Sequence, residues 1–396
     1  MAKVSVKDLD LKGKRVFIRV DFNVPIKNGA IKDDTRVRAS LPTITHVLEQ
    51  GGTAICASHL GRPKGGPNPE MSLAPVATRL GELLGRPVVF ATDCVGEPAR
   101  AAIAKAGSNG LVLLENLRFH PEEEKNDPAF AKQLAELADV YVNDAFGSAH
   151  RAHAATEGIA RHMKLAGAGL LMADEVAYMG KALEAPERPF VAVLGGAKVS
   201  DKLEVIQNLL GKVDALVIGG AMAYTFLKAR GLPVGTSLVE DDLLDAARTI
   251  EANAKARGIR FELPTDHVVA EKLEAGVPTE TLAVSDPRIG DRMGLDIGPE
   301  TVKRYAEVIA GAHTVVWNGP MGVFEIDAFA AGTNAVAQAV AGVQGTTIIG
   351  GGDSISAVTK AGVAKKISHI STGGGASLEF LGGRTLPGVA ILPDTR

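Results

Sequence analysis

Three consecutive glycines interrupt the stretch IIGGGDSISAVTK at residues 348–360, between an apolar run and a segment with helical periodicity. A strand that stops at glycines and continues as a helix exposes backbone N–H groups, which can bind an anion such as phosphate. The stretch does not fit the P-loop pattern GxxxxGK[ST], so the matching positive charge has to come from another segment. A second run, STGGGASLEF at 371–380, repeats three glycines before an expected helix and strengthens the case for a phosphate site.

Cationic side chains recur where expected strands give way to helices. Lys198 and Lys202 follow the glycines of VLGGAKVSDK and would lie one turn apart on the opening helix. Other cations occupy comparable positions: Arg36, His59, Arg62, Arg118 and Arg151. A cation at a helix N-terminus is unfavourable by about 0.3–1 kcal/mol, and a bound polyanion would turn that penalty into attraction. Each cation alone reads better as a solvated surface charge, but together they predict sites for phosphorylated ligands.

Asp353 stands directly after the first triple glycine. A carboxylate beside bound phosphate is repulsive unless a cation lies between them, so the sequence predicts Mg²⁺ at Asp353. The alternative is an N-cap, a role that Asp353 or Ser354 could fill equally well.

Length and composition are those of a two-domain globular protein. The chain has 396 residues, of which 46% are hydrophobic and 22% charged. Its net charge of −3 and 4% aromatic residues argue against a nucleic-acid binder. Two cysteines, Cys56 and Cys94, are too few for a disulfide framework. The N-terminus does not read as a signal peptide, and the uncharged residues 328–352 read as a helix and a strand. We therefore expect a cytoplasmic protein.

Short β-branched runs alternate with longer amphipathic ones, which predicts parallel sheets covered by helices on both faces. Strands are expected at 15–20, 53–58, 86–91, 111–116, 140–146, 189–196, 215–220, 314–319 and 346–352. Helices are expected at 36–52, 129–138 and 202–213. A further helix begins near Gly169 and is halted by Pro186 and Pro189, so it reads as a connector between two α/β domains.

Eight motifs then identify a family resemblance that spans nearly the whole chain. In order they are RVDFNVP, SHLGRP, LLENLRF, NDAFGSAHRAH, GGAKVSDK, NGPMGVFE, GGGDS and STGGGASLE. With them the chain resembles the phosphoglycerate kinase family. The resemblance implies two doubly wound, Rossmann-like parallel-sheet domains, at 1–170 and 187–379. A connecting helix at 171–186 would join them, and a tail at 380–396 would pack back on the first domain.

The resemblance also implies an activity. Members of the family transfer a phosphoryl group reversibly, with Mg²⁺, between 1,3-bisphosphoglycerate and ADP, giving 3-phosphoglycerate and ATP. The first domain would bind the glycerate and the second the nucleotide, so domain closure would be needed to bring the ligands together and exclude water. We expect a monomer whose partners are these small molecules, with no nucleic acid and no membrane.

Site residues follow from the matching motifs. The glycerate would be bound by Asp21, Asn23, Arg36, His59, Arg62, Arg118 and Arg151. The nucleotide would be bound by Gly196, Lys202, Gly219, Gly294, Asn318, Glu325, Gly350, Gly351, Gly352, Asp353 and Ser354. The transferring group would be stabilised by Arg36, Lys198 and the backbone N–H groups of Gly352 and Gly375.

Two other functions fit the sequence less well. A dinucleotide-dependent dehydrogenase needs GxGxxG after an early strand, and neither VLGGAKVSD nor TTIIGGGDS has that spacing. A non-catalytic phosphometabolite-binding protein would keep the arginines without a competent lysine and metal site. The presence of Lys198, Lys202 and Asp353 argues against it.

Overall fold

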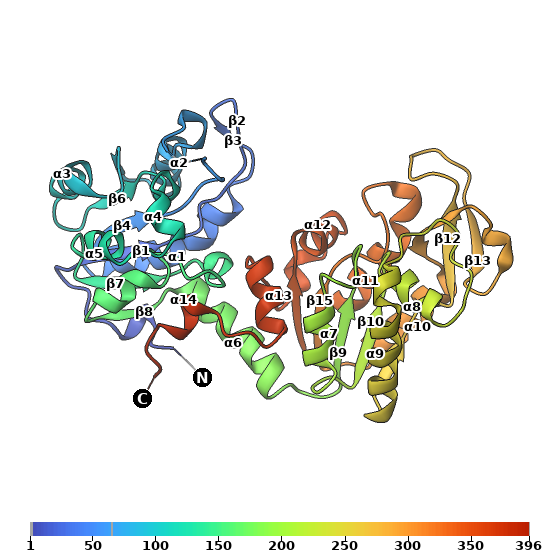
Figure 1. Cartoon of the computed structure of the whole chain (residues 1–396). Coiled ribbons are helices and arrows are strands. Elements are labelled where there is room, and N and C mark those ends of the chain that lie inside the picture. Colours follow the sequence, from blue (N-terminus) through green and yellow to red (C-terminus); the bar gives the residue numbers. More distant parts are fainter. Residues whose placement is uncertain (1–2, 65, 396) are drawn as a thin grey trace. The chain divides into compact units, whose positions relative to one another are not determined.

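The computed structural model describes residues 3–64 and 66–395, and the chain divides into two compact units. Unit 1 comprises Met1–Ala177 and Thr385–Arg396, and unit 2 comprises Tyr178–Arg384 (Figure 1). The division falls inside helix α6 (Leu170–Glu184), whereas the sequence placed the end of the first domain at 170. Residues 380–384, which were expected in the returning tail, belong to unit 2.

Unit 1 is built on a six-stranded parallel sheet. Across the sheet the strands are β5 (Val89–Ala91), β6 (Leu111–Leu114), β4 (Thr53–Ala57), β1 (Arg15–Arg19), β7 (Val140–Asn143) and β8 (Ala166–Ala168). A small hairpin joins β2 (Ile26–Lys27) to β3 (Ala30–Ile31). The helices are α1 (Thr35–Glu49), α2 (Ala74–Leu84), α3 (Gly96–Ala106), α4 (Pro121–Glu124), α5 (Pro128–Ala135) and α14 (Pro387–Ala390). The five strands expected in this half are confirmed.

Side-chain alternation along these strands builds a core on each face of the sheet. Val16 and Ile18 of β1 pack with Val37 and Ile44 of α1 and with residues of α2, and all are buried. Phe17 of β1 lies between them in sequence and therefore points to the opposite face. Burial on both faces explains why the strands read as continuous apolar runs.

Unit 2 is built on a second six-stranded parallel sheet. Across it the strands are β11 (Arg260–Glu262), β10 (Ala215–Ile218), β9 (Phe190–Leu194), β15 (Thr314–Asn318), β16 (Thr346–Gly350) and β17 (His369–Ile370). Its helices are α7 (Leu203–Leu209), α8 (Ala223–Ala229), α9 (Leu244–Ala256), α10 (Pro299–Ala310), α11 (Ala331–Ala341), α12 (Gly352–Lys360) and α13 (Gly375–Leu381). From β9 the earlier-numbered half of the sheet extends to one side and from β15 the later half extends to the other, so the winding switches between these two strands. Doubly wound sheets bind ligands at such a switch point.

The register of these strands sets the position of that ligand-binding crevice. Asn318 at the end of β15 pairs with Leu194 of β9 on one side and Gly350 of β16 on the other. The three strands therefore finish level with one another, and the glycine-rich loops that follow them start at one edge of the sheet.

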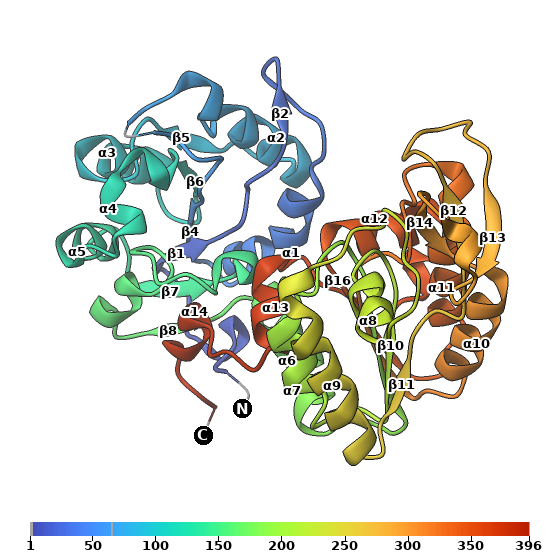
Figure 2. The same cartoon turned by 45° about the vertical axis from the view of Figure 1, so that its right-hand side comes forward.

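A three-stranded antiparallel sheet in unit 2 was not anticipated from the sequence. It consists of β13 (Glu280–Ala283), β12 (Asp266–Ala270) and β14 (Met293–Ile297) and lies beside α10 and α11 (Figure 2). Its strands are short and only partly apolar, so their periodicity is weak. The sheet matters to the site because β12 and β14 supply part of a cavity wall.

The uncharged residues 328–352 contain α11 and β16, as expected. Within residues 3–64 and 66–395 the structure has no helix that is both long and apolar enough to cross a membrane.

The C-terminal tail is integrated into unit 1. The backbone N–H of Gly388 in α14 donates to the carbonyl of Ala149 at 2.8 Å, and the Asn143 side-chain amide donates to the carbonyl of Gly388 at 3.2 Å. Further along, the N–H of Val4 donates to the carbonyl of Pro393 at 2.9 Å. Leu392 is 2% exposed, so the tail contributes apolar burial as well as hydrogen bonds.

We predict that Leu392→Ala destabilises unit 1 by about 2–5 kcal/mol, because it removes a buried side chain and leaves a cavity. Leu165→Ala, in the same unit, is the matched control, since Leu165 is 39% exposed and its loss should change stability by less than about 0.5 kcal/mol. Native-state hydrogen exchange of β1 and β7 measures the stability of unit 1 separately from that of unit 2. Equal protection in both variants would contradict a stabilising role for the tail.

Candidate functional site

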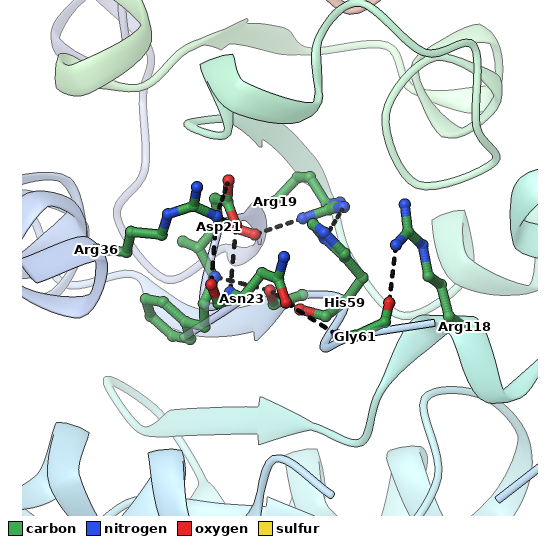
Figure 3. A network of polar contacts seen from close by, with 10 residues as sticks. Arg19, Asp21, Asn23, Arg36, His59, Gly61 and Arg118 are labelled. Carbon is green, nitrogen blue, oxygen red and sulfur yellow. Dashed lines mark hydrogen bonds and ion pairs between the residues drawn. The ribbon is translucent and has the colours of Figure 1, made fainter. Parts of the chain in front are cut away.

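Unit 1 gathers a row of polar side chains at the carboxyl ends of its strands (Figure 3). Arg36, in the first turn of α1, donates to the Asp21 carboxylate at 3.0 and 3.1 Å and to the carbonyl of Asn23 at 3.3 Å. The Asn23 side-chain oxygen accepts from the N–H of Gly61 at 2.9 Å, and Arg118 donates to the carbonyl of Gly61 at 2.8 Å. Segments that follow β1, β4 and β6 are thereby joined in one network.

Arg19 lies at the centre of this network, and sequence reasoning missed it. It is the last residue of β1 and is 1% exposed. Its Nη2 lies 3.1 Å from Nδ1 of His59, and its Nη1 donates to the carbonyl of Val20. A guanidinium can only donate, so Nδ1 of His59 must accept. His59 is therefore neutral in this arrangement and carries its proton on Nε2. The available signal was an arginine inside an otherwise apolar strand.

Two buried histidines in this region, one in the network and one near its arginines, are held neutral. Burial, together with the positive charges of Arg19, Arg118 and Arg36, lowers the pKa of His59 well below its ordinary value. Burial and Arg118 likewise lower the pKa of His153 to about 4. The positive charge at neutral pH therefore comes from the arginines, not from the histidines.

Acidic groups offset part of the repulsion among the arginines. Burial lowers the pKa of Arg118, as do Arg19 and Arg151, whereas Glu124 of α4 raises it. Glu124 lies 3.3 Å from Arg118 Nε. Glu123, the preceding residue, is fully buried, and burial raises the pKa of its carboxyl while Arg19 opposes that shift.

Arg151 and Arg62 stand further from the hydrogen-bonded network. Arg151 is exposed, yet it is close enough to influence the pKa of both Arg118 and His153. Arg62 is also exposed, and it lines a surface hollow with Lys64, Pro67 and Met71 on the Pro/Gly-rich loop. Of the seven glycerate-binding residues expected from sequence, five therefore lie in the network, one beside it and one on the neighbouring loop.

In unit 2, two lysines face a cavity of about 570 Å³ at the switch point of the sheet. The expected residues that line it are Gly196, Lys198, Lys202, Asn318, Gly351, Gly352, Asp353 and Ser354. One expectation was wrong: the helix does not begin at Lys198. α7 starts at Leu203 with Lys202 as its N-cap, so Lys198 lies in the preceding turn and is exposed.

Lys202 is the buried cation of this cavity. It is 8% exposed, and its ammonium donates to the Asn318 side-chain oxygen. The Asn318 amide donates in turn to the carbonyl of Gly350 at 2.9 Å, which fixes the orientation of the asparagine. Burial lowers the pKa of Lys202 to about 8, against the opposing attraction of Asp201 and Asp353. The structure thus holds a desolvated ammonium that a phosphate oxygen would stabilise.

A second cavity, of about 340 Å³, adjoins the first and is mostly apolar. Gly196, Ala197, Pro320 and Asp353 line both cavities. The expected residues Gly294 and Glu325 line the second one, and Glu325 is exposed. Its wall also includes Leu238 and Leu273, which are 48% and 52% exposed. Large exposed leucines around a hollow are typical of a surface that an apolar ligand covers.

Three expected glycines do not line either cavity, but they shape the surrounding wall. A side chain at Gly219 would come within 2.3 Å of Sδ of Met321, which lines the apolar cavity. Gly350 closes β16, and Gly351 has a φ of +93°, a conformation that favours glycine. Gly375 is the exposed first residue of α13, and its neighbour Gly374 lines the lysine cavity.

Several wall residues of the apolar cavity were not found from sequence. Tyr224 of α8 and His267 of β12 stack with centroids 5.7 Å apart, and the Tyr224 hydroxyl lies 3.0 Å from Nδ1 of His267. Burial lowers the pKa of His267 to about 4, and burial raises the pKa of Asp296 to about 7. These residues come from α8 and the antiparallel sheet, which no local motif connects to the glycine loops.

Asp353 is the residue best suited to bind a metal ion in this region. It lies in the first turn of α12, is exposed, and lines both cavities. The N-cap of α12 is Gly351, so neither Asp353 nor Ser354 has the capping role that the sequence left open. The Ser354 hydroxyl instead accepts from the N–H of Gly319 at 2.7 Å. Asp201 also lines the cavity that contains the two lysines. An exposed carboxylate such as Asp353 fits a divalent metal ion that is bound mainly through ligand oxygens and water.

The chain is similar to known proteins in both sequence and structure. A family model described as phosphoglycerate kinase matches residues 6–384. The curated phosphoglycerate kinases of Koribacter versatilis and Moorella thermoacetica are 58% and 59% identical to the chain, and each alignment covers 100% of both proteins. The solved phosphoglycerate kinases of Coxiella burnetii and Pyrococcus horikoshii OT3 superpose with TM-scores of 0.90 and 0.84, at 44% and 34% identity, over 98% of each chain.

We predict that the affinity of unit 2 for ADP falls as the pH rises through about 8, because Lys202 then loses its proton. The decrease should approach about tenfold per pH unit above that value, since one proton is linked to binding. Lys202→Arg keeps its charge over the same range, so its affinity should stay level from pH 7 to 9.5 even if it is weaker overall. Isothermal titration of ADP into the metal-free proteins measures the affinity of the unmodified protein and of the variant at each pH. An affinity of the unmodified protein for ADP that does not change with pH would contradict a contact between the Lys202 ammonium and the ADP phosphates.

Proposed function

The chain belongs to the phosphoglycerate kinase family, and on that premise we propose that unit 1 binds the glycerate substrate and unit 2 binds the nucleotide. The protein is a phosphotransferase that acts on the carboxyl group of 3-phosphoglycerate, and it uses a nucleotide substrate with a divalent metal. Full-length similarity to curated kinases favours this activity over a non-catalytic phosphometabolite-binding protein.

The observation that best supports the proposal is the pair of adjoining cavities in unit 2. One is apolar and the other contains two lysines, and they meet at Gly196, Ala197, Pro320 and Asp353. A nucleotide has the same division, with an apolar base at one end and anionic phosphates at the other. We assign the base and ribose to the cavity lined by Gly294 and Glu325, and the phosphates to the cavity lined by Lys198, Lys202 and Asn318.

In unit 1 the arginine network is the complementary anion site. Arg36 and Arg118 lie on either side of Arg19 and His59 (Figure 3) and project from segments that follow different strands. Arg36 already binds Asp21, which keeps its guanidinium near the network in the absence of ligand. We propose that Asp21 and Asn23 contact the polar groups of the glycerate, and that the arginines contact its phosphate and carboxylate.

The proposed mechanism needs no general base. In the direction of ATP formation, an oxygen of the ADP β-phosphate attacks the acyl phosphate, and the bond from phosphorus to the glycerate carboxyl oxygen breaks. The leaving group is a carboxylate with a pKa of about 4, and the attacking oxygen is already ionised, so no proton has to move. Histidines held neutral by burial are compatible with this chemistry.

What the reaction does need is alignment and compensation of negative charge on the transferring phosphoryl group. We propose that Arg36 and Lys198 supply the positive charge, with the backbone N–H groups of Gly352 and Gly375. Lys202 then binds a nucleotide phosphate. Because the two ligands bind to different units, closure must bring them together during the reaction and exclude water.

We propose that Mg²⁺ is the metal and that Asp353 is its protein ligand. The ion would neutralise part of the phosphate charge and remove the repulsion between the phosphates and the carboxylate. We also propose that the protein is a cytoplasmic monomer, as the family resemblance implies.

We predict that Arg36→Ala lowers kcat by about 10²–10³, the effect of removing one charged donor from the reacting group. Arg38→Ala is the matched control. Arg38 lies two residues along the same helix and is paired with Asp34 at 2.9 Å on the surface, so its loss should change kcat by less than about twofold. A coupled assay with 3-phosphoglycerate, ATP and Mg²⁺ measures the formation of 1,3-bisphosphoglycerate. Similar activity in the two variants would rule out the role given to Arg36.

We predict that Asp353→Asn affects the affinity for ADP differently with and without metal. In EDTA the variant should bind ADP at least as tightly as the unmodified protein, because a carboxylate that repels phosphate is gone. With Mg²⁺ it should bind ADP more weakly by roughly tenfold or more, because the metal has lost its protein ligand. Asp327→Asn is the control, since that carboxylate is exposed and pairs with Lys360 at 3.2 Å. Equal weakening in both conditions would exclude Asp353 as the metal ligand.

A further inference from the structure

Asp93, Cys94 and His120 form a cluster in unit 1, outside the proposed phosphoryl-transfer site. Carboxylate, thiol and imidazole are the side-chain types that bind transition metals. Asp93 and Cys94 follow β5, and His120 lies between the 3₁₀ turn Leu117–Phe119 and α4. One carboxylate oxygen, the Cys94 sulfur and one ring nitrogen of His120 all lie within 4.8 Å of one another. Nε2 of His120 is 2.7 Å from Oδ1 of Asp93.

The surrounding structure fixes the position of each group. Oδ1 of Asp93 accepts from the N–H of Cys94 at 2.6 Å, which sets the orientation of the carboxylate. The His120 ring stacks on Phe130 of α5 with centroids 5.2 Å apart. The thiol is buried, whereas the side chains of Asp93 and His120 are partly exposed, so solvent reaches the group from their side. Ordered ligands lower the entropic cost of binding.

Glu123 places a further carboxylate near the thiol, and Arg19 and Arg118 compensate part of its charge. Glu123 is fully buried, and its Oε1 has no hydrogen-bond partner among the described residues. A dication bound by the Cys94 thiolate would attract this carboxylate as well as that of Asp93.

We propose that Asp93, Cys94 and His120 form a binding site for one divalent transition-metal ion of the zinc type, distinct from the metal that accompanies the nucleotide. The ligand set is mixed oxygen, sulfur and nitrogen, which suits Zn²⁺ and Co²⁺ rather than Mg²⁺. On binding, the Cys94 proton passes to solvent as the sulfur–metal bond forms, and water completes a tetrahedral arrangement. Tetrahedral zinc places its ligand atoms about 3.3–3.6 Å apart. The sulfur therefore has to move inward, and the hydrogen bond of 2.7 Å between His120 and Asp93 has to open as both bind the ion.

The site has a direct connection to substrate binding. His120 is two residues from Arg118, and the adjoining α4 carries Glu124, which pairs with Arg118 at 3.3 Å. A metal that joins His120 to Asp93 and Cys94 would therefore restrain the segment that positions one of the glycerate-binding arginines. We expect slower amide exchange over residues 117–124 when the ion is bound.

Titration of the nucleotide-free protein with Co²⁺ tests the proposal. We expect one Co²⁺ per chain, with a thiolate-to-cobalt charge-transfer band that Zn²⁺ abolishes by displacement. Cys94→Ser should remove the band, whereas Cys56→Ser should leave it intact, since Cys56 is a buried thiol in the core of β4. Absence of a thiolate band in the unmodified protein, or its persistence in Cys94→Ser, would overturn the proposal.

Two further variants keep the test decisive if Cys94→Ser fails to fold. Asp93→Asn and His120→Gln alter partly exposed side chains, and each should weaken Co²⁺ binding by more than about tenfold, the effect expected when a ligand of a small site is lost. Zn²⁺ should slow exchange of residues 117–124 in the unmodified protein but not in His120→Gln. Unchanged affinity in both variants would mean that the ion is held elsewhere and would refute the site.

Discussion

Both proposed binding regions contain cations whose placement is unfavourable until an anionic ligand binds, because the arginines of unit 1 repel one another and a lysine of unit 2 is buried. In unit 1, burial lowers the pKa of Arg118, and the nearby charges of Arg19 and Arg151 lower it further. All three arginines also act on the buried His153. The fold offsets this repulsion with carboxylates at the edges, Asp21 on Arg36 and Glu124 on Arg118. It also keeps His59 and His153 neutral, so they add no further charge.

In unit 2 the unfavourable placement comes from burial rather than from repulsion. Lys202 is held by the Asn318 oxygen in a place where water cannot fully solvate it, and its pKa falls accordingly. That arrangement is unfavourable in the empty protein and becomes favourable when phosphate supplies the missing charge. Glycines allow the loops to pack closely. A side chain at Gly195 would come within 2.1 Å of the carbonyl oxygen of Pro320, and one at Gly319 within 2.2 Å of the carbonyl oxygen of Gly195. Close packing of the loops after β9 and β15 thus shapes the cavity floor.

Parallel strands explain how such distant residues meet. Register places Leu194, Asn318 and Gly350 side by side, so loops separated by more than a hundred residues begin at one edge. The order of strands in unit 2 reverses at β9 and β15, and both cavities lie there. In unit 1 the network likewise draws on the segments after β1, β4 and β6, which are neighbours in its sheet. The order and register of the strands, rather than any single motif, bring the charged residues of each unit together.

The sequence by itself determined nine strands of the two parallel sheets, four of the helices, the glycine turns and most of the charged residues of both regions. Those features depend on local periodicity, on the conformational range of glycine and on side-chain chemistry, all of which are visible in a short window. Only the tertiary structure decided how deeply Arg19 is buried, which nitrogen of His59 carries the proton, and that Tyr224 and His267 line the apolar cavity. It also moved the start of α7 to Leu203 and brought Cys94 to His120. Burial and proximity arise from contacts between residues far apart in the chain, and no local pattern encodes them.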